Sequence, residues 1–175
     1  MELVHTAEFE SPLGSMMCAS TGRGLAYLRL PRASGRGFAG WLRRNAPGAE
    51  VRPGFGPNKA AVQQLLEYLE GKRRRFDLAL DLRGTDFQRR VWDALLEIPY
   101  GETRSYADVA RAIGAPPLAA RAVGSANGAN PVALVVPCHR VVASGGKLGG
   151  YGGGLPLKRK LLALERARPR AGDLL

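Results

Sequence analysis

The stretch "SYADVARAIGAPPLAARAVGSAN", residues 105–127, contains two short helical patterns separated by a tight break. In the first pattern Ser105 can cap a helix, and Asp108 lies three residues further on, which approximates a capping box. Gly114 and the "APP" behind it end this helix and make a turn. The second pattern, "LAARAVGSAN", occupies residues 118–127. Two helices of about ten residues around such a turn indicate a helix-turn-helix.

The second of these helices is rich in Ala, Gly and Ser and poor in bulky side chains. A helix of this kind can bring its backbone close to a partner, whereas a helix that reads base edges uses long polar side chains. Arg121 is the one long basic side chain in the segment. The pattern therefore favours close contact with a nucleic-acid backbone or a narrow groove, with Arg121 as the basic probe.

The elements before this stretch suggest two domains. Thr85 can cap a helix whose apolar face holds Phe87, Val91, Trp92, Leu95 and Leu96. We expect Trp92 to pack in a core rather than to stack on a nucleobase. Further upstream, alternating apolar residues at 22–31 predict a strand, helical spacing at 59–72 predicts an amphipathic helix, and residues 38–45 fit a short helix. The sequence thus predicts a small α/β domain over residues 1–80, followed by a mainly α, winged-helix-like domain with a helix-turn-helix over residues 81–175.

The composition is that of a folded, strongly basic protein. Of the 175 residues, 45% are hydrophobic and 23% are charged, a balance typical of globular domains. Lys and Arg number 26 against 15 Asp and Glu, for a formal net charge of +11, which makes a polyanion the obvious partner. A genome that favours Arg codons would also raise this count, and the run Arg73 to Arg75 fits a solvated surface equally well.

The N-terminal segment and the two cysteines lead us to expect a protein of a reducing compartment. The N-terminus lacks a basic region followed by a long apolar run, and no segment has the apolar length of a membrane span. Cys18 and Cys138 are far apart and lie in unlike segments, so nothing suggests a disulfide framework. We expect a cytoplasmic protein without a membrane partner.

The second cysteine has unusual neighbours. The apolar run "PVALVV" at 131–136 predicts a buried strand that Pro137 stops, so that Cys138 lies where the strand ends. A free cysteine is often only a small buried hydrophobe. His139 and Arg140 follow directly, however, and positive groups near a thiol lower its pKa from about 8.5 and raise its thiolate fraction. The pattern leaves a structural and a reactive cysteine open.

Hydrolase and metal chemistry fit this segment poorly. Neighbours in an extended chain point to opposite sides, so Cys138 and His139 cannot share a direct hydrogen bond unless the chain turns or a water intervenes. The chain has no paired CxxC and no HxxxH, and Cys and His together number four, so we expect no metal.

A glycine-rich segment and a helix close the chain. The segment "GGKLGGYGGGLP" at 145–156 is not a Walker A loop, because Lys147 is followed by Leu148 rather than by Ser or Thr. It fits a linker, or a loop that forms one wall of a pocket with its backbone N–H groups exposed. The pattern "PLKRKLLALERA" at 156–167 predicts a last helix that carries Glu165.

Three runs together resemble one family: "GETRSYADVARAIG", "ARAVGSANGANPVALVVPCHRVV" and "GGYGGGLPLKRKLLALE". They are similar to the methylated-DNA protein-cysteine methyltransferases, also called O6-alkylguanine-DNA alkyltransferases. The resemblance runs from about Asp81 to Glu165, and the Pro-Cys-His-Arg-Val string in this context is very specific. The block before Asp81 is compatible in size with the family's variable domain.

The resemblance implies a role for each matching residue of the reacting group. Cys138 would accept the alkyl group, and His139 would deprotonate its thiol through a water. Glu165 would orient His139, and Asn130 matches the family's asparagine hinge. The relay through a water removes the geometric objection to a Cys–His pair.

The resemblance also implies how DNA is held. Tyr106 matches the tyrosine that helps to rotate the nucleotide, and Arg121 matches the finger that fills the vacated stack, with the helix-turn-helix in the minor groove. The substrate pocket would be formed by Val141, Tyr151, Gly152 and Gly153. Some members have serine where this chain has Gly152, so a contact made by that hydroxyl is absent here.

The implied function is DNA repair by direct transfer of the alkyl group from O6-alkylguanine to Cys138, with O4-alkylthymine as a further candidate substrate. Because a thioether has no hydrolytic exit, each molecule would act once, as a monomer on double-stranded DNA and without a cofactor. Two alternatives stay open: a protein that binds alkylated DNA without repairing it, and a helix-turn-helix transcription factor. The presence of Cys138 favours transfer over the first alternative.

Overall fold

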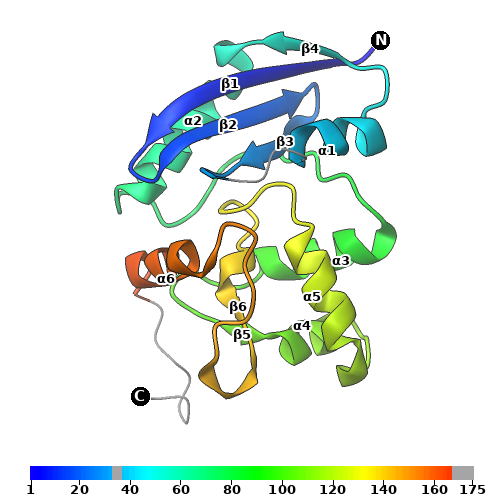
Figure 1. Cartoon of the computed structure of the whole chain (residues 1–175), viewed down its shortest axis with the longest axis vertical. Helices are drawn as coiled ribbons and strands as arrows, with labels where there is room; N and C mark the ends of the chain where they lie inside the picture. The colour runs from blue at the N-terminus through cyan, green and yellow to red at the C-terminus, as the bar shows by residue number, and fades with distance from the viewer. Residues whose placement is uncertain (33–36, 167–175) are drawn as a thin grey trace. The chain divides into compact units, whose positions relative to one another are not determined.

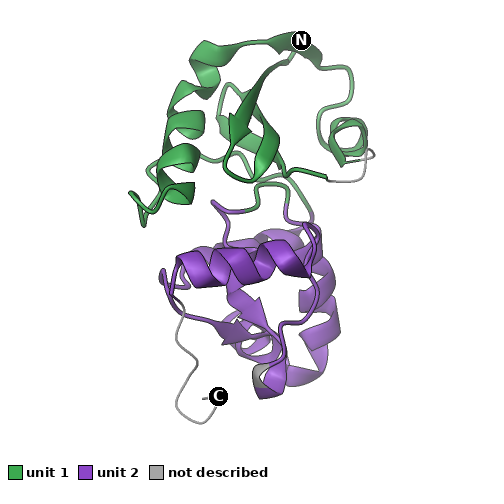
Figure 2. Cartoon of the chain, turned by 60° about the vertical axis from the view of Figure 1, so that its left-hand side comes forward, with its two compact units in different colours: residues 1–84, 131–133 green, residues 85–130, 134–175 purple. Residues whose placement is uncertain are grey.

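The computed structural model describes residues 1–32 and 37–166 and divides the chain into two compact units (Figures 1 and 2). The first unit comprises Met1–Gly84 together with Pro131–Ala133, and the second comprises Thr85–Asn130 together with Leu134–Leu175. An α/β unit therefore precedes a mainly helical one, as the sequence predicts. Residues 131–133 lie in the first unit, although the sequence analysis places them in the second domain.

The first unit is built on a four-stranded sheet in the order β3-β2-β1-β4. Its strands are β1 (Leu3–Ser11), β2 (Gly14–Thr21), β3 (Gly24–Arg29) and β4 (Glu50–Pro53), of which only β4 pairs in parallel, with β1. Helix α2 (Phe55–Leu69) packs on β1 and β2, and α1 (Gly37–Asn45) contacts β3. The predicted strand and both predicted helices are present, with α2 starting before the predicted Lys59. One apolar cluster of this unit contains Val4, Met17, Ala19, Ala26, Trp41 and Ala46.

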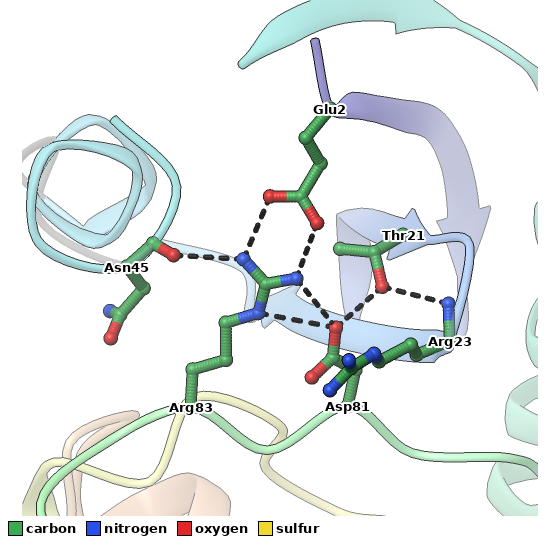
Figure 3. A network of polar contacts seen from close by, with 6 residues as sticks. All are labelled: Glu2, Thr21, Arg23, Asn45, Asp81 and Arg83. Carbon is green, nitrogen blue, oxygen red and sulfur yellow. Dashed lines mark hydrogen bonds and ion pairs between the residues drawn. The ribbon is translucent and has the colours of Figure 1, made fainter. Parts of the chain in front are cut away.

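A polar network centred on Arg83 ties together the first unit (Figure 3). The Arg83 guanidinium donates to Glu2 Oε1 at 2.8 Å, to Asp81 Oδ2 at 2.9 Å and to the Asn45 carbonyl at 2.8 Å. Thr21 Oγ1 also donates to Asp81 Oδ2, at 2.6 Å. Burial would raise the pKa of Asp81, but the hydrogen bonds from Arg83 and Thr21 outweigh it and lower that pKa. The network thus joins the residue before β1, the end of β2 and the end of α1 to the last residues before the second unit begins.

The second unit contains four α-helices and short accessory elements in its described residues. The helices are α3 (Asp86–Leu96), α4 (Tyr106–Ala112), α5 (Ala120–Gly128) and α6 (Leu155–Leu164). Strands β5 (Arg104–Ser105) and β6 (Val141–Val142) form a parallel pair, and the 3₁₀ turns are η1 (Pro117–Ala119), η2 (Cys138–Arg140) and η3 (Ser144–Gly146). Residue 167, the last of the predicted closing helix, lies outside the described residues.

Helix α3 starts and packs as predicted, with one exception. Thr85 and Gln88 form a reciprocal capping box at its N-terminus. Trp92 is 1% exposed and its indole Nε1 donates to the Ala126 carbonyl at 2.8 Å, which confirms that it is a core residue. Leu96 is 41% exposed, so its placement on the apolar face was wrong. Consecutive helical residues diverge by about 100°, and Leu95 takes the inward position.

Helices α4 and α5 form the predicted pair around a turn. Ser105 and Asp108 complete a capping box at the start of α4, and Gly114 adopts a φ of 75° after its end. The turn η1 leads into α5, and the three elements contact one another. Among the described residues no helix has the length and apolarity that crossing a membrane requires.

The predicted strand at 131–136 does not form. These residues are buried, but the bridge between Val132 and Leu28 is isolated, outside any named strand, and Leu134 has a φ of 73°. A left-handed residue breaks an extended ladder, so the segment turns at Leu134 instead of running on to Pro137. A continuous apolar run therefore indicated burial but not conformation. Cys138 consequently begins the turn η2 and does not end a strand.

Candidate active site

The candidate nucleophile lies in a tight double turn. Pro137, with φ −81° and ψ 65°, is the centre of an inverse γ-turn that the Cys138 N–H closes on the Val136 carbonyl at 2.8 Å. The N–H of Val141 then donates to the Cys138 carbonyl and closes the 3₁₀ turn η2. Because the chain turns on both sides of Cys138, the opposite orientation expected for neighbours in an extended chain does not apply to His139.

The Cys138 thiol is buried among polar groups. Burial raises its pKa, while a hydrogen bond from the Asn130 side chain, the positive charge of Lys158 and the Tyr151 hydroxyl act in the opposite direction. The net pKa lies above the ordinary value, so the prediction that neighbouring positive groups would lower it was wrong. The free energy needed to bury a thiolate is larger than the stabilisation that these groups give it. At neutral pH the resting side chain is a thiol and needs a base.

His139, Arg140 and Glu165 form a buried triad of side chains. His139 Nε2 lies 2.7 Å from Glu165 Oε2, while Arg140 donates through Nε to Oε1 at 2.8 Å and through Nη2 to Oε2 at 2.9 Å. A further bond from Arg140 Nη1 reaches the Ile98 carbonyl at 2.7 Å. Glu165 follows α6 as its C-cap, so the end of that helix delivers the carboxylate.

The charges of this triad follow from its burial and its hydrogen bonds. Burial alone would raise the pKa of Glu165, but the bonds from His139 and Arg140 outweigh it and lower that pKa to about 2. Burial lowers the pKa of His139, although its contact with Glu165 acts in the opposite direction. The carboxylate is therefore balanced by the Arg140 guanidinium, and the imidazole is neutral at pH 7. Since a carboxylate only accepts hydrogen bonds, Nε2 carries the proton and Nδ1 is the basic nitrogen.

Lys158 is a further buried residue of the site that the sequence analysis did not single out. Its side chain is fully buried, and Nζ donates to the carbonyls of Val141 at 2.7 Å, of Gly150 at 3.2 Å and of Leu148. Burial lowers the pKa of Lys158 to about 8. One ammonium group thus holds β6 and the glycine-rich loop together. The signal for it was its place three residues before Leu161, on the inward face of α6.

The glycine-rich loop lies against Tyr106, the first residue of α4. The Gly150 N–H donates to the Tyr106 hydroxyl, whose pKa burial nonetheless raises. Gly149 has a φ of 72°, and a Cβ at this position would lie 2.8 Å from Tyr106 Oη. Only glycine permits both this backbone conformation and this approach. The loop is therefore fitted to Tyr106 and does not behave as a plain linker.

The remaining pocket residues differ in exposure. Val141 is fully buried in β6. The Tyr151 hydroxyl is buried beside the Cys138 sulfur, and burial raises its pKa well above the ordinary value. Gly152 is exposed, no atom lies within 4 Å of an added Cβ there, and Gly153 is half-buried. The loop is thus closed toward Cys138 and open at Gly152.

The structure brings most of the predicted site residues together. Electrostatic or hydrogen-bonding contact links Cys138 to Asn130, Tyr106, Tyr151 and Lys158, while His139 follows in the same turn and holds Glu165. Arg121 is exposed on the first turn of α5. The second unit therefore combines an internal thiol and base with an exposed helix of small residues and one arginine.

Comparison with known proteins gives consistent matches. A sequence model described as 6-O-methylguanine DNA methyltransferase, DNA binding domain, matches residues 86–167. The methylated-DNA–protein-cysteine methyltransferase of Mycobacterium tuberculosis strain H37Rv is 49% identical over 170 residues, which cover 97% of this chain and 96% of the relative. That of Methanosarcina barkeri is 46% identical over 156 residues, covering 89% and 93%.

Solved structures agree with these sequence matches. A crystal structure of Mycobacterium tuberculosis OGT in complex with DNA is similar with a TM-score of 0.80 at 50% identity, covering 97% of this chain and 96% of that one. The O6-methylguanine-DNA methyltransferase of Pyrococcus kodakaraensis reaches a TM-score of 0.62 at 26% identity, covering 93% and 98%. These matches confirm the predicted fold class. The chain belongs to the methylated-DNA–protein-cysteine methyltransferase family.

Proposed function

We propose that the protein repairs DNA by moving the alkyl group of O6-alkylguanine to Sγ of Cys138, one group per protein molecule. The observation that carries this proposal is a buried thiol followed in the same turn by a neutral histidine, which a buried carboxylate orients, with His139 Nε2 at 2.7 Å from Glu165 Oε2. A thiol with a raised pKa needs such a base. The family membership supports the same chemistry.

The transfer balances without a cofactor. The thiol proton passes to His139 through a bridging water, as the family resemblance implies, and the thiolate attacks the alkyl carbon. The S–C bond forms as the C–O6 bond breaks, and the guanine takes the electron pair. A proton from the Tyr106 hydroxyl can neutralise the leaving base. The product is a thioether at Cys138, which water cannot hydrolyse, so the protein acts once.

The helix-turn-helix supports DNA as the partner. Helix α5 offers small residues and the exposed Arg121, which suits close approach to the minor groove. A base must leave the stack before a buried thiol can reach its O6 substituent, and this extrusion costs a few kcal/mol. We propose that Arg121 occupies the vacated space while Tyr106 helps to rotate the nucleotide. The related Mycobacterium tuberculosis protein has been crystallised with DNA.

A stoichiometry experiment tests the function. The protein is mixed with an excess of duplex DNA containing O6-methylguanine, and repaired base is measured together with the mass of each cysteine peptide. We expect product to stop at one equivalent per protein, with the mass of one methylene added to the peptide of Cys138. Multiple turnovers, or a need for a methyl donor, would contradict the proposal.

Two controls identify the acceptor. Cys138→Ala should abolish transfer while retaining binding to alkylated duplex, because the exposed face of α5 does not depend on the sulfur. Cys18 serves as an internal control, since it is fully buried in β2 and burial raises its pKa to about 12. Label on Cys18 would overturn the assignment. Binding without transfer by the wild type would favour the alternative of a lesion-binding protein.

A further inference from the structure

Two asparagines at and just beyond the end of α5 donate hydrogen bonds to the turn that carries Cys138. Asn130 Nδ2 donates to the Val136 carbonyl at 2.8 Å, and Asn127 Nδ2 donates to the Cys138 carbonyl at 3.3 Å. Asn127 is 4% exposed. The family resemblance assigns a role to Asn130 but none to Asn127. The bond from Asn127 to the carbonyl of Cys138 therefore has no role in the resemblance, although Cys138 is the reacting residue.

These bonds fix both peptide groups that flank the thiol. The Val136 carbonyl accepts from the Cys138 N–H as well as from Asn130, and the Cys138 carbonyl accepts from the Val141 N–H as well as from Asn127. The direction of a Cα–Cβ bond follows from the two peptide planes beside it. The peptide before Cys138 is held by its N–H, through the Val136 carbonyl that Asn130 also binds, and the peptide after it is held by its carbonyl, so the direction of Cβ, from which Sγ extends, is restricted.

The helix end that carries Asn127 is itself anchored. Trp92, in the core of α3, donates from Nε1 to the carbonyl of Ala126 at 2.8 Å, and Asn127 is the next residue. Val123 and Ala126 are buried on the same helix. The amide that reaches Cys138 therefore extends from a fixed backbone and does not depend on a mobile loop.

The side-chain amide of Asn127 has one satisfied end and one unsatisfied end, which indicates that the bond made by Nδ2 has a function. Its Oδ1 atom is buried and has no hydrogen-bond partner within the described residues. Burying an unsatisfied amide oxygen costs free energy, and an apolar side chain of similar size avoids this cost. A residue that serves only to fill this space would be better replaced by leucine. Asparagine at this position is explained by the one bond that its Nδ2 makes.

We propose that Asn127 is a positioning residue for Cys138: through the Cys138 carbonyl it holds the thiol in register with Asn130, Tyr151 and Lys158. The consequence for transfer rests on the proposed function, but the effect on the thiol does not. Loss of the bond lets the nucleophile turn rotate, which weakens the contacts that favour the thiolate. Reactivity then falls while the fold is retained.

The test compares Asn127→Leu with the wild type in two assays. In the first, single-turnover transfer from O6-methylguanine duplex should slow on the order of tenfold, because a misplacement of about 1 Å can cost 10²-fold and the loss of one hydrogen bond to the turn shifts the thiol by less. In the second, alkylation of Cys138 by iodoacetamide is followed against pH by mass spectrometry. The midpoint of this profile should move to higher pH, while the thermal midpoint of unfolding stays equal or rises.

Asn58→Leu is the matched control for a general loss of structure. Asn58 is fully buried in the first unit, where its amide donates to the carbonyls of His5 and Gly54. Its replacement should lower the thermal midpoint and leave the pH profile of Cys138 unchanged. Opposite movements of stability and reactivity in the two variants distinguish positioning from folding.

Three outcomes decide the proposal. An Asn127→Leu protein that folds, transfers at the wild-type rate and keeps the pH midpoint would overturn it. If this variant fails to fold, Asn127→Ser replaces it, because serine lacks the Nδ2 donor and adds no bulk; an unshifted midpoint in that variant would also overturn the proposal. If the wild type transfers nothing from DNA, the proposed function fails, while the iodoacetamide profile still tests Asn127.

Discussion

Glu165 binds His139 through Oε2 at 2.7 Å in a site where both side chains are fully buried. The carboxylate does not make the imidazole positive, because Arg140 already supplies the balancing charge. It selects the tautomer and holds the ring. A histidine in this state is a proton acceptor at neutral pH, which suits a thiol whose pKa is raised.

The first prediction concerns the rate of transfer in Glu165→Gln. An uncharged amide can still hold the ring but no longer stabilises the imidazolium that forms when His139 takes the thiol proton. We expect single-turnover transfer to slow by about 10²-fold, the lower part of the range for general-base catalysis. Rapid-quench kinetics on O6-methylguanine duplex measure this change. An unaltered rate would show that Glu165 does not stabilise a base at His139.

The second prediction is the acid dependence of stability. The pKa of Glu165 is about 2 in the folded protein, against about 4.3 in an unfolded chain. Its contribution is therefore fully present above about pH 4.3 and is lost as the pH falls toward 2, a total of about 3 kcal/mol. Urea unfolding at pH 6 and pH 3 should show slightly more than half of this loss, about 1.7 kcal/mol, in the wild type and not in Glu165→Gln. Glu67→Gln, which removes a partly exposed ion pair with Arg73, should retain it.

The third prediction concerns Lys158. Its folded pKa of about 8 lies below the unfolded value of about 10.4, so protonation disfavours folding and stability should rise between these two pH values. In a Cys138→Ala background, which removes the titration of the thiol, Lys158→Met should flatten that rise. In the wild-type background Lys158→Met should slow transfer, because the carbonyls of Val141 and Gly150 lose their donor. If the transfer rate matched that of the wild type and the pH profile of stability matched that of Cys138→Ala, Lys158 would have no role in holding β6 and the glycine-rich loop.

The fourth prediction separates base extrusion from backbone binding. Arg121→Ala should slow repair of duplex DNA more than repair of single strands, because only a duplex has a stack to fill. Arg111→Ala is the control, since Arg111 is an exposed arginine on α4 that pairs with Asp108. Equal losses on both substrates would mean that Arg121 contacts phosphate only. Rates are compared at one salt concentration, because phosphate contacts depend strongly on salt.

The fifth prediction concerns the Arg83 network of the first unit (Figure 3). Arg83→Met leaves Asp81, 9% exposed, without its guanidinium partner, and we expect a loss of about 1–3 kcal/mol in the free energy of unfolding. Single-turnover transfer per folded molecule should not change. Chemical denaturation and an active-site titration give both quantities on one sample. A fall in the rate without a fall in stability would contradict the structural role.

Local chemistry explains what the sequence could predict. The capping boxes at Thr85 and Ser105 each depend on residues three positions apart, so the starts of α3 and α4 could be read directly. The resemblance of the string around Cys138 and of the run that ends at Glu165 is the basis for proposing Cys138 as the nucleophile, His139 as its base and Glu165 as the group that orients the base. None of these inferences required knowledge of distant contacts.

The predictions that were wrong, and the residues that were missed, depend on contacts between parts of the chain that are distant in the sequence. The direction of the Cys138 pKa shift depends on how completely the fold covers the thiol, and a list of neighbouring charges does not contain that information. Residues 131–136 form a turn at Leu134 and an isolated bridge from Val132 to Leu28. A strand would need a longer pairing partner, and the local sequence does not show whether one is present. Lys158 and Asn127 act on carbonyls that lie 8 to 17 positions away in the sequence, where no helical or strand spacing predicts a contact.

The assignment of Pro131–Ala133 to the first unit has a consequence for modularity. The N–H of Leu28 on β3 donates to the Pro131 carbonyl at 2.8 Å, so the first unit takes part of its sheet edge from a segment far along the chain. A fragment that stops at Gly84 lacks this partner, and a fragment that starts at Thr85 carries Pro131–Ala133 without the strand β3 to which they bond. Recombination between relatives can therefore exchange the first unit only together with a compatible insert between Asn130 and Leu134.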